Sequence, residues 1–136
     1  MEEMKFAEDG RSRPAGMGDF RLVSPDGEHV VEILYEGEPP HGDSYHRIAI
    51  DDRVFPGYAW GCQFAFTPCS RYLAFSWMPR RFERRTVVAD VRDVLYAVLP
   101  EYIYDFSFSW PALTGEGKMS AGQAFTFHGS ELWEQY

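Results

Sequence analysis

The chain contains one cluster of potential metal ligands, in which His41, Asp43 and His46 lie within six residues. A zinc site usually takes four such ligands at short, regular spacings, and this segment offers no regular fourth ligand. Pro39 and Pro40 precede the cluster, which is typical of an exposed loop. We therefore expect neither a metal site nor a bound cofactor, although a metal held by these three residues would favour an enzyme.

Residues able to act in covalent or acid–base catalysis are present, but their spacing does not support such chemistry. No serine lies in a Gly-x-Ser-x-Gly turn, and Cys69 has no histidine placed beside it by the sequence. The adjacent carboxylates Asp51 and Asp52 suit a hairpin turn for reasons of backbone geometry alone. Residues 115–118 lack the spacing of a phosphate-binding loop. We expect no catalytic residues and a protein that is not an enzyme.

The strongest charge feature is a basic segment around Phe82. It holds four of the thirteen basic residues, namely Arg80, Arg81, Arg84 and Arg85. The net charge of −8 opposes binding to the phosphates of nucleic acids or to an anionic membrane, and favours a basic partner. The expected partners therefore include no nucleic acid and no membrane.

Three prolines set the spacing of the elements that must position these residues. Pro25, Pro68 and Pro111 are spaced 43 residues apart, and each follows a short apolar run. Such a period is typical of a repeated supersecondary unit, and the flanking segments alternate in hydrophobicity as half-buried strands do. The sequence predicts an irregular arm over residues 1–18 and one all-β domain over residues 19–136. The domain divides into units 19–57, 58–100 and 101–136, the third of which lacks an evident second strand in residues 112–122.

The strand–turn–strand segments 23–31 and 66–75, built around Pro25 and Pro68, resemble the blade motif of TolB-type and WD-repeat propellers. The resemblance implies antiparallel four-stranded blades and leaves the activity open. Propellers close with roughly four to eight blades, whereas this chain has three units. The units can form a compact β-sandwich or partial propeller, pair with a second chain, or dock open strand edges on a partner. The compact blade-like sandwich is the favoured prediction.

Two further segments complete the predicted binding surface. The loop of the first unit, which corresponds to the basic segment of the second, is acidic and contains Glu36, Glu38 and Asp43. Between the second and third units, two tyrosines are flanked by acidic residues, a composition suited to recognition. These residues are Glu101, Tyr102, Tyr104 and Asp105. The predicted partner-binding residues are these seven and the four arginines.

Composition bounds the class of protein. The 136 residues are 45% hydrophobic and 17% aromatic, enough for one domain with a core. No apolar run is long enough for a membrane helix, and the first residues do not resemble an export signal. Cys62 and Cys69 are expected to be reduced thiols, which favours a cytoplasmic location.

A small, acidic, aromatic-rich all-β domain without catalytic motifs resembles, in general character, the immunity proteins that bacteria keep against secreted toxins. The resemblance implies a non-catalytic protein that binds and inhibits a cognate toxin. The alternative is a self-associating, propeller-like scaffold, in which the oppositely charged loops pair between two chains of a homodimer.

Overall fold

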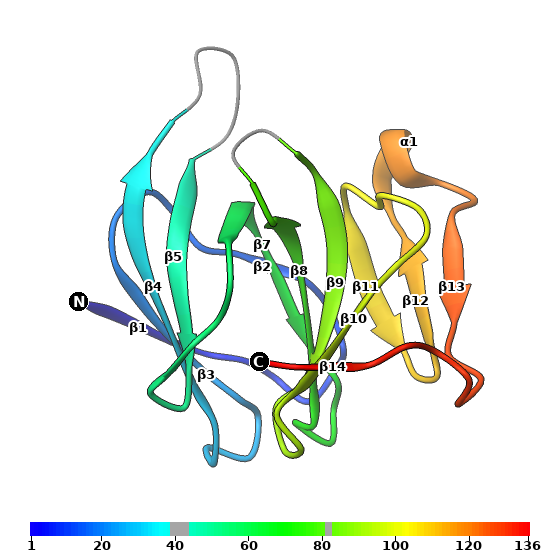
Figure 1. Ribbon diagram of the computed structural model, residues 1–136, viewed down its shortest axis with the longest axis horizontal. Helices are drawn as coiled ribbons and strands as arrows, with labels where there is room; N and C mark the ends of the chain where they lie inside the picture. The colour runs from blue at the N-terminus through cyan, green and yellow to red at the C-terminus, as the bar shows by residue number, and fades with distance from the viewer. Residues whose placement is uncertain (39–43, 81–82) are drawn as a thin grey trace.

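The computed structural model describes residues 1–38, 44–80 and 83–136 as strands and turns with one short helix (Figure 1). The strands form an eleven-stranded sheet and a three-stranded sheet. Within the described residues, every strand pair is antiparallel except β1 with β3. The all-β class predicted from the alternation of the sequence is therefore confirmed.

Figure 1 shows the strands as three layers side by side. The first layer contains β3 (Phe20–Val23), β4 (Val30–Gly37), β5 (Tyr45–Ile50) and β6 (Arg53–Val54). The second contains β7 (Tyr58–Phe66), β8 (Tyr72–Met78), β9 (Arg85–Asp90) and β10 (Leu95–Val98), and the third contains β11 (Phe106–Ser109), β12 (Ala112–Gly115) and β13 (Ala124–Thr126). The large sheet passes from the first layer to the second where β5 and β7 pair, at Tyr45–Trp60 and His46–Ala59.

The middle layer is buried on both faces, because alternate residues of its strands face different neighbours. Toward the first layer it presents large side chains such as Phe64, Phe66 and Phe75, which lie in one core cluster with buried aliphatic residues of β3, β4 and β5. Toward the third layer it presents small residues, including Ala65 and Ala74. There the volume is filled by aromatic residues of the third layer, which are Phe106, Phe108 and Phe127. Complementary sizes on facing layers give a dense core.

The 43-residue spacing corresponds to a repeated turn geometry. The Ser24 N–H donates to the His29 carbonyl (3.0 Å), and 43 residues later the Thr67 N–H donates to the Tyr72 carbonyl (2.9 Å). Gly27 and Ser70, again 43 residues apart, both have positive φ angles, of 75° and 68°. The Asp26 N–H also donates to Ser70 Oγ (2.9 Å), so the two equivalent turns lie against each other.

The third unit has a second strand, contrary to the sequence-based expectation. β12 begins at Ala112, and it pairs with both β11 and β13. The hairpin turn between β11 and β12 consists of Trp110 and Pro111 alone, whereas the equivalent turns of the other units are longer. β12 therefore starts closer to its proline than the second strands of the first two units do, and Gly115 is its last residue.

Residues 1–18 also depart from the expected irregular arm. β1 (Glu2–Lys5) pairs with β3, and β2 (Arg13–Pro14) pairs with β7. Between them, Gly10 accepts a hydrogen bond from the Phe108 N–H (2.7 Å), so this arm contacts all three layers. At the other end of the chain, β14 (Glu134–Gln135) pairs with β10, and Tyr136 packs against Phe55 of the β6–β7 connection.

The outer faces of the first and third layers carry polar side chains. On the first layer, Arg21 pairs with Glu32 (3.6 Å) and Arg47 pairs with Glu36 (3.1 Å). On the third layer, Thr114 and Thr126 lie on the face opposite the buried Leu113. Polar side chains on the outer faces help to end a stack of repeated layers, although Leu34 and Val54 are also exposed on the first layer.

Candidate protein-binding surface

One end of the three layers gathers most of the residues predicted to bind a partner. β4, β8 and β10 end there, and β5, β7 and β9 begin there, as their pairing registers require. We call this the loop end; it is uppermost in Figure 1. The predicted residues found there are Glu36, Glu38, Arg80, Arg84, Arg85, Glu101, Tyr102, Tyr104 and Asp105. Asp43 and Arg81 lie outside the described residues.

An aromatic cluster forms the floor of the loop end. It consists of Tyr45, Tyr58, Trp60, Met78 and Tyr102, and we call it the Trp60 cluster. The Trp60 side chain is only 4% exposed, and the ring centroids of Trp60 and Tyr102 are 6.3 Å apart. Arg84 lies over this floor, with its guanidinium carbon 4.2 Å from the Trp60 ring centroid. An arginine on an indole face keeps its charge while covering apolar surface.

Backbone geometry at the start of β7 positions Trp60. Gly57 has a positive φ of 70°, and a Cβ at this position would overlap the carbonyl oxygen of Met78. Only glycine therefore allows this close approach of β7 to the end of β8. Four residues later, the Gly61 N–H donates to the Ser44 carbonyl (2.8 Å), which fixes the chain on the other side of Trp60.

The segment that carries Tyr102 and Tyr104 is fixed by buried hydrogen bonds. The Ile103 N–H donates to Thr86 Oγ1 (2.8 Å), and the Thr86 hydroxyl donates back to the Ile103 carbonyl (3.3 Å). Gln123 Nε2 donates to the Tyr102 carbonyl (3.1 Å). With Ile103 only 1% exposed, Tyr102 lies half-buried on the Trp60 cluster, and Tyr104 remains 38% exposed.

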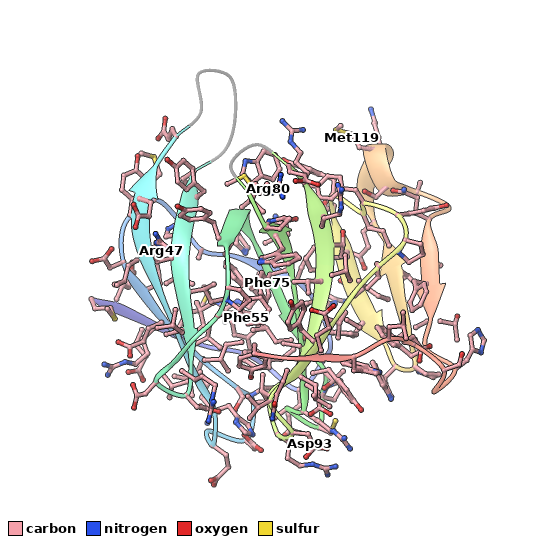
Figure 2. The ribbon with its side chains drawn as sticks, viewed as in Figure 1. Arg47, Phe55, Phe75, Arg80, Asp93 and Met119 are labelled. Atoms are coloured by element: carbon pink, nitrogen blue, oxygen red, sulfur yellow. The ribbon has the colours of Figure 1, made fainter. Side chains whose placement is uncertain are left out.

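A four-residue helix, α1 (Gly117–Ser120), adds an exposed methionine to the same end. Met119 is 80% exposed, and Figure 2 shows it at the same end of the molecule as Arg80. The helix is attached to the tyrosine segment, because the Asp105 N–H donates to Ser120 Oγ (3.1 Å) and the Glu116 N–H donates to the Asp105 carbonyl (2.8 Å). The sequence analysis missed Met119, since nothing in its glycine-containing surroundings sets it apart.

The charges at the loop end are partly neutralised by near neighbours. Glu36 accepts from Arg47 on the adjacent strand, and Arg85 donates to Glu83 (2.7 Å). Within the described residues no ion pair joins the acidic loop to the basic loop, and none involves Arg80 or Arg84. Within the described residues, the positive charge of these two arginines is therefore not paired with a carboxylate.

The histidine and carboxylate cluster of the first loop is separated by the structure. His46 is fully buried; its Nε2 donates to the Gly18 carbonyl (2.9 Å), and its Nδ1 has no hydrogen-bond partner among the described residues. Burial lowers the pKa of His46, which favours the neutral ring. His41 and Asp43 lie outside the described residues. In the part of the chain that the structure describes, no three histidine, cysteine or acidic side chains are grouped to hold a metal ion.

Asp51 and Asp52 form the two-residue turn between β5 and β6, as predicted, with φ angles of 50° and 64°. The Asp51 carboxylate accepts hydrogen bonds from the Val30 N–H (2.8 Å) and from His29 Nδ1 (2.7 Å). The Asp51 carboxylate is thus used to hold the β5–β6 turn against the start of β4.

In the described residues no helix is both long and apolar enough to cross a membrane. No protein-family model matches the chain, and no curated protein and no solved structure matches it either.

Proposed function

We propose that this is a non-catalytic binding protein of the cytoplasm whose loop end engages a bacterial toxin and blocks its activity. The observation that carries the proposal is the composition of that end. Arg84 over Trp60, exposed Tyr104 and exposed Met119 are of the residue types enriched in the centres of protein interfaces.

The rigidity of the scaffold supports the proposal. Two of these side chains belong to backbone segments held by buried contacts: Trp60 by Gly57 and Gly61, and Tyr104 through Ile103 and Thr86. A surface that is already ordered loses less conformational entropy on association, which favours tight binding. Inhibition by occlusion requires such a surface and no reacting group.

The test is co-purification of the tagged protein from its native host, followed by identification of the partner and measurement of the partner's activity. We expect a partner whose toxic activity is abolished at a one-to-one ratio. Arg84→Ala and Tyr104→Ala are each expected to weaken binding by more than about fivefold, as central interface residues do. Arg53→Ala, an exposed arginine on β6, is the matched control and should change little.

The alternative, self-association through the oppositely charged loops, gives a different result in light scattering. A dimer held by those loops would dissociate as salt is raised, because screening weakens exposed ion pairs. A salt-sensitive dimer without a captured partner would replace the proposed function. A monomer that binds a protein lacking any inhibited activity would retain the surface but reject the role of toxin inhibitor.

A further inference from the structure

A second candidate site lies at the opposite end of the layers, near Asp93 in Figure 2. A cavity of about 330 Å³ opens between the second and third layers. Four of its lining residues are aromatic and come from separate parts of the chain: Tyr72 begins β8, Trp110 is in the β11–β12 turn, and Phe127 and Trp133 follow β13. We call this cavity the aromatic pocket.

The four aromatic residues contact one another in a closed circuit. The ring centroids of Tyr72 and Trp110 are 3.9 Å apart, and those of Trp110 and Phe127 are 5.1 Å apart. Phe127 and Trp133 are 5.7 Å apart, and Trp133 returns to Tyr72 at 6.2 Å. Trp110 is nevertheless 38% exposed, an unusual position for an indole that already has three aromatic neighbours. Its exposed surface leaves room for a ligand.

Three carboxylates and one guanidinium also line the pocket. Asp90 is buried and accepts two hydrogen bonds from Arg71 Nε (3.2 Å to each oxygen) and one from Arg71 Nη2 (2.8 Å). Arg71 also donates to Asp93 (3.1 Å), and its guanidinium carbon lies 5.1 Å from the Tyr72 ring centroid. The third carboxylate is Glu131. The pocket already holds one cation of the chain between an aromatic face and two acids.

The net charge of the pocket is negative. Asp90, Asp93 and Glu131 outnumber Arg71, even when the exposed Arg92 beside Asp93 is counted with it. Backbone N–H groups of His128 and Gly129 donate to the Glu131 carboxylate and hold its pKa below the usual value, so Glu131 is charged at neutral pH. This charge balance excludes an anion and favours a positively charged ligand.

The hydrogen bonds already made by these carboxylates narrow the choice of cation. Asp90 accepts from Arg71 and from the N–H groups of Arg92 and Asp93, and both oxygens of Glu131 accept from the backbone. An ammonium or guanidinium ligand would have to share these oxygens with hydrogen bonds that the chain already makes. A methylated ammonium group has no N–H to satisfy, and aromatic faces attract it through their quadrupoles. We propose that the aromatic pocket binds a quaternary or methylated ammonium group.

The test uses choline and its uncharged isostere 3,3-dimethyl-1-butanol, which has the same shape without the positive charge. The four tryptophans give four indole N–H signals in a proton–nitrogen correlation spectrum. We expect choline to shift the signals of Trp110 and Trp133 and to leave those of Trp60 and Trp77 in place. Choline should bind about tenfold more tightly than the neutral isostere. Equal binding of the two compounds, or no choline-dependent shift beyond that of sodium chloride, would overturn the proposal.

Charge-neutralising variants test the pocket without removing its walls. Asp93→Asn and Glu131→Gln are each expected to weaken choline binding by about two- to fivefold, because each removes one charge from a partly exposed site. Glu3→Gln, an exposed acid on β1, is the control. Trp133→Leu should weaken binding further, and its spectrum shows whether the fold is kept. If a folded Trp133→Leu protein and both charge variants bound choline as the wild type does, the pocket would not be the site.

The same titration with a trimethyllysine amide distinguishes two sources of the group. Tighter binding of choline would assign the pocket to a small free ligand, whereas tighter binding of the amide would assign it to a methylated side chain of a protein. Either outcome supports the proposed chemistry.

Discussion

Replacing Phe55 by alanine is expected to lower the free energy of unfolding by about 4 kcal/mol. Phe55 is 1% exposed and lies between the first and second layers (Figure 2). Its ring centroid is 5.3 Å from that of Phe75 and 5.1 Å from that of Tyr96. Trp77 and Tyr136 complete its surroundings, at 6.1 Å and 4.9 Å. The Phe55 side chain therefore joins the segment between β6 and β7 to β8, to β10 and to Tyr136.

The magnitude follows from these contacts. Full burial of a phenylalanine side chain contributes about 2–3 kcal/mol by transfer from water. The void left by alanine and the lost contacts with aromatic rings add roughly 1–2 kcal/mol, because the surrounding rings belong to strands that cannot collapse inward. Phe55→Leu retains most of the volume and is expected to cost only about 1 kcal/mol.

Urea unfolding, followed by tryptophan fluorescence and by circular dichroism, measures the effect. For a slope of about 2 kcal/mol per molar urea, the midpoint should fall by about 2 M in Phe55→Ala. The neighbouring Val54 is 72% exposed, so Val54→Ala is the matched control and should leave the midpoint nearly unchanged. A midpoint in Phe55→Ala within about 0.5 M of wild type would refute the assignment of Phe55 as the connection between the layers.

Three further predictions concern single side chains. His46 has a lowered pKa in the folded protein, so on acidification the unfolded chain takes up a proton at a higher pH than the folded protein does. Stability is therefore expected to fall as the pH drops below about 6.5. In His46→Gln this part of the acid dependence of urea unfolding should vanish, and its persistence would show that another group causes it. Val94 has a φ of 59°, a region that disfavours β-branched residues, so Val94→Asn should raise the free energy of unfolding by about 1 kcal/mol, while the same change at Val98 in the regular strand β10 should lower it. Thr86→Val keeps the shape of the side chain but removes the hydroxyl that pairs with the N–H and carbonyl of Ile103. It should lower the free energy of unfolding by about 1–3 kcal/mol and weaken partner binding. A stable variant with normal binding would show that Thr86 does not position the tyrosine segment.

The regular parts of the fold could be predicted because they depend on local patterns. The segments 23–31 and 66–75, predicted as strand–turn–strand, contain the β3–β4 and β7–β8 turns of the structure. The turns after Ser24 and Thr67 could be predicted too, because proline and a residue able to adopt positive φ define them locally.

The missed strands have no such local signal. β1 is exposed at three of its four positions, so its pairing with β3 comes from the backbone and not from an apolar pattern. β12 follows a turn of only two residues, whereas the corresponding turns of the first two units are longer. The repeat therefore did not indicate where β12 begins.

The candidate site depended on both kinds of information. The segment 101–105 was predicted as a binding surface from composition alone, and the structure places it at the loop end with Arg80, Arg84 and Arg85. Arg84 and Trp60 are 24 residues apart in sequence, and only the pairing of β7 with β8 and of β8 with β9 brings them into contact. The aromatic pocket collects residues from Tyr72 to Trp133, a separation at which no sequence motif operates.

The contact of both chain termini with several layers has a consequence for how the protein reaches its structure. The Ser12 N–H donates to Ser107 Oγ across a separation of 95 residues, and β14 pairs with β10, which lies before the third layer in the sequence. Contacts so distant along the chain carry a high entropic cost of loop closure and slow the folding of a small domain. We expect the middle hairpins to form first, and the strand edges of β3, β7 and β10 to stay exposed until both termini dock. During synthesis this interval is the one in which the nascent chain is most exposed to aggregation.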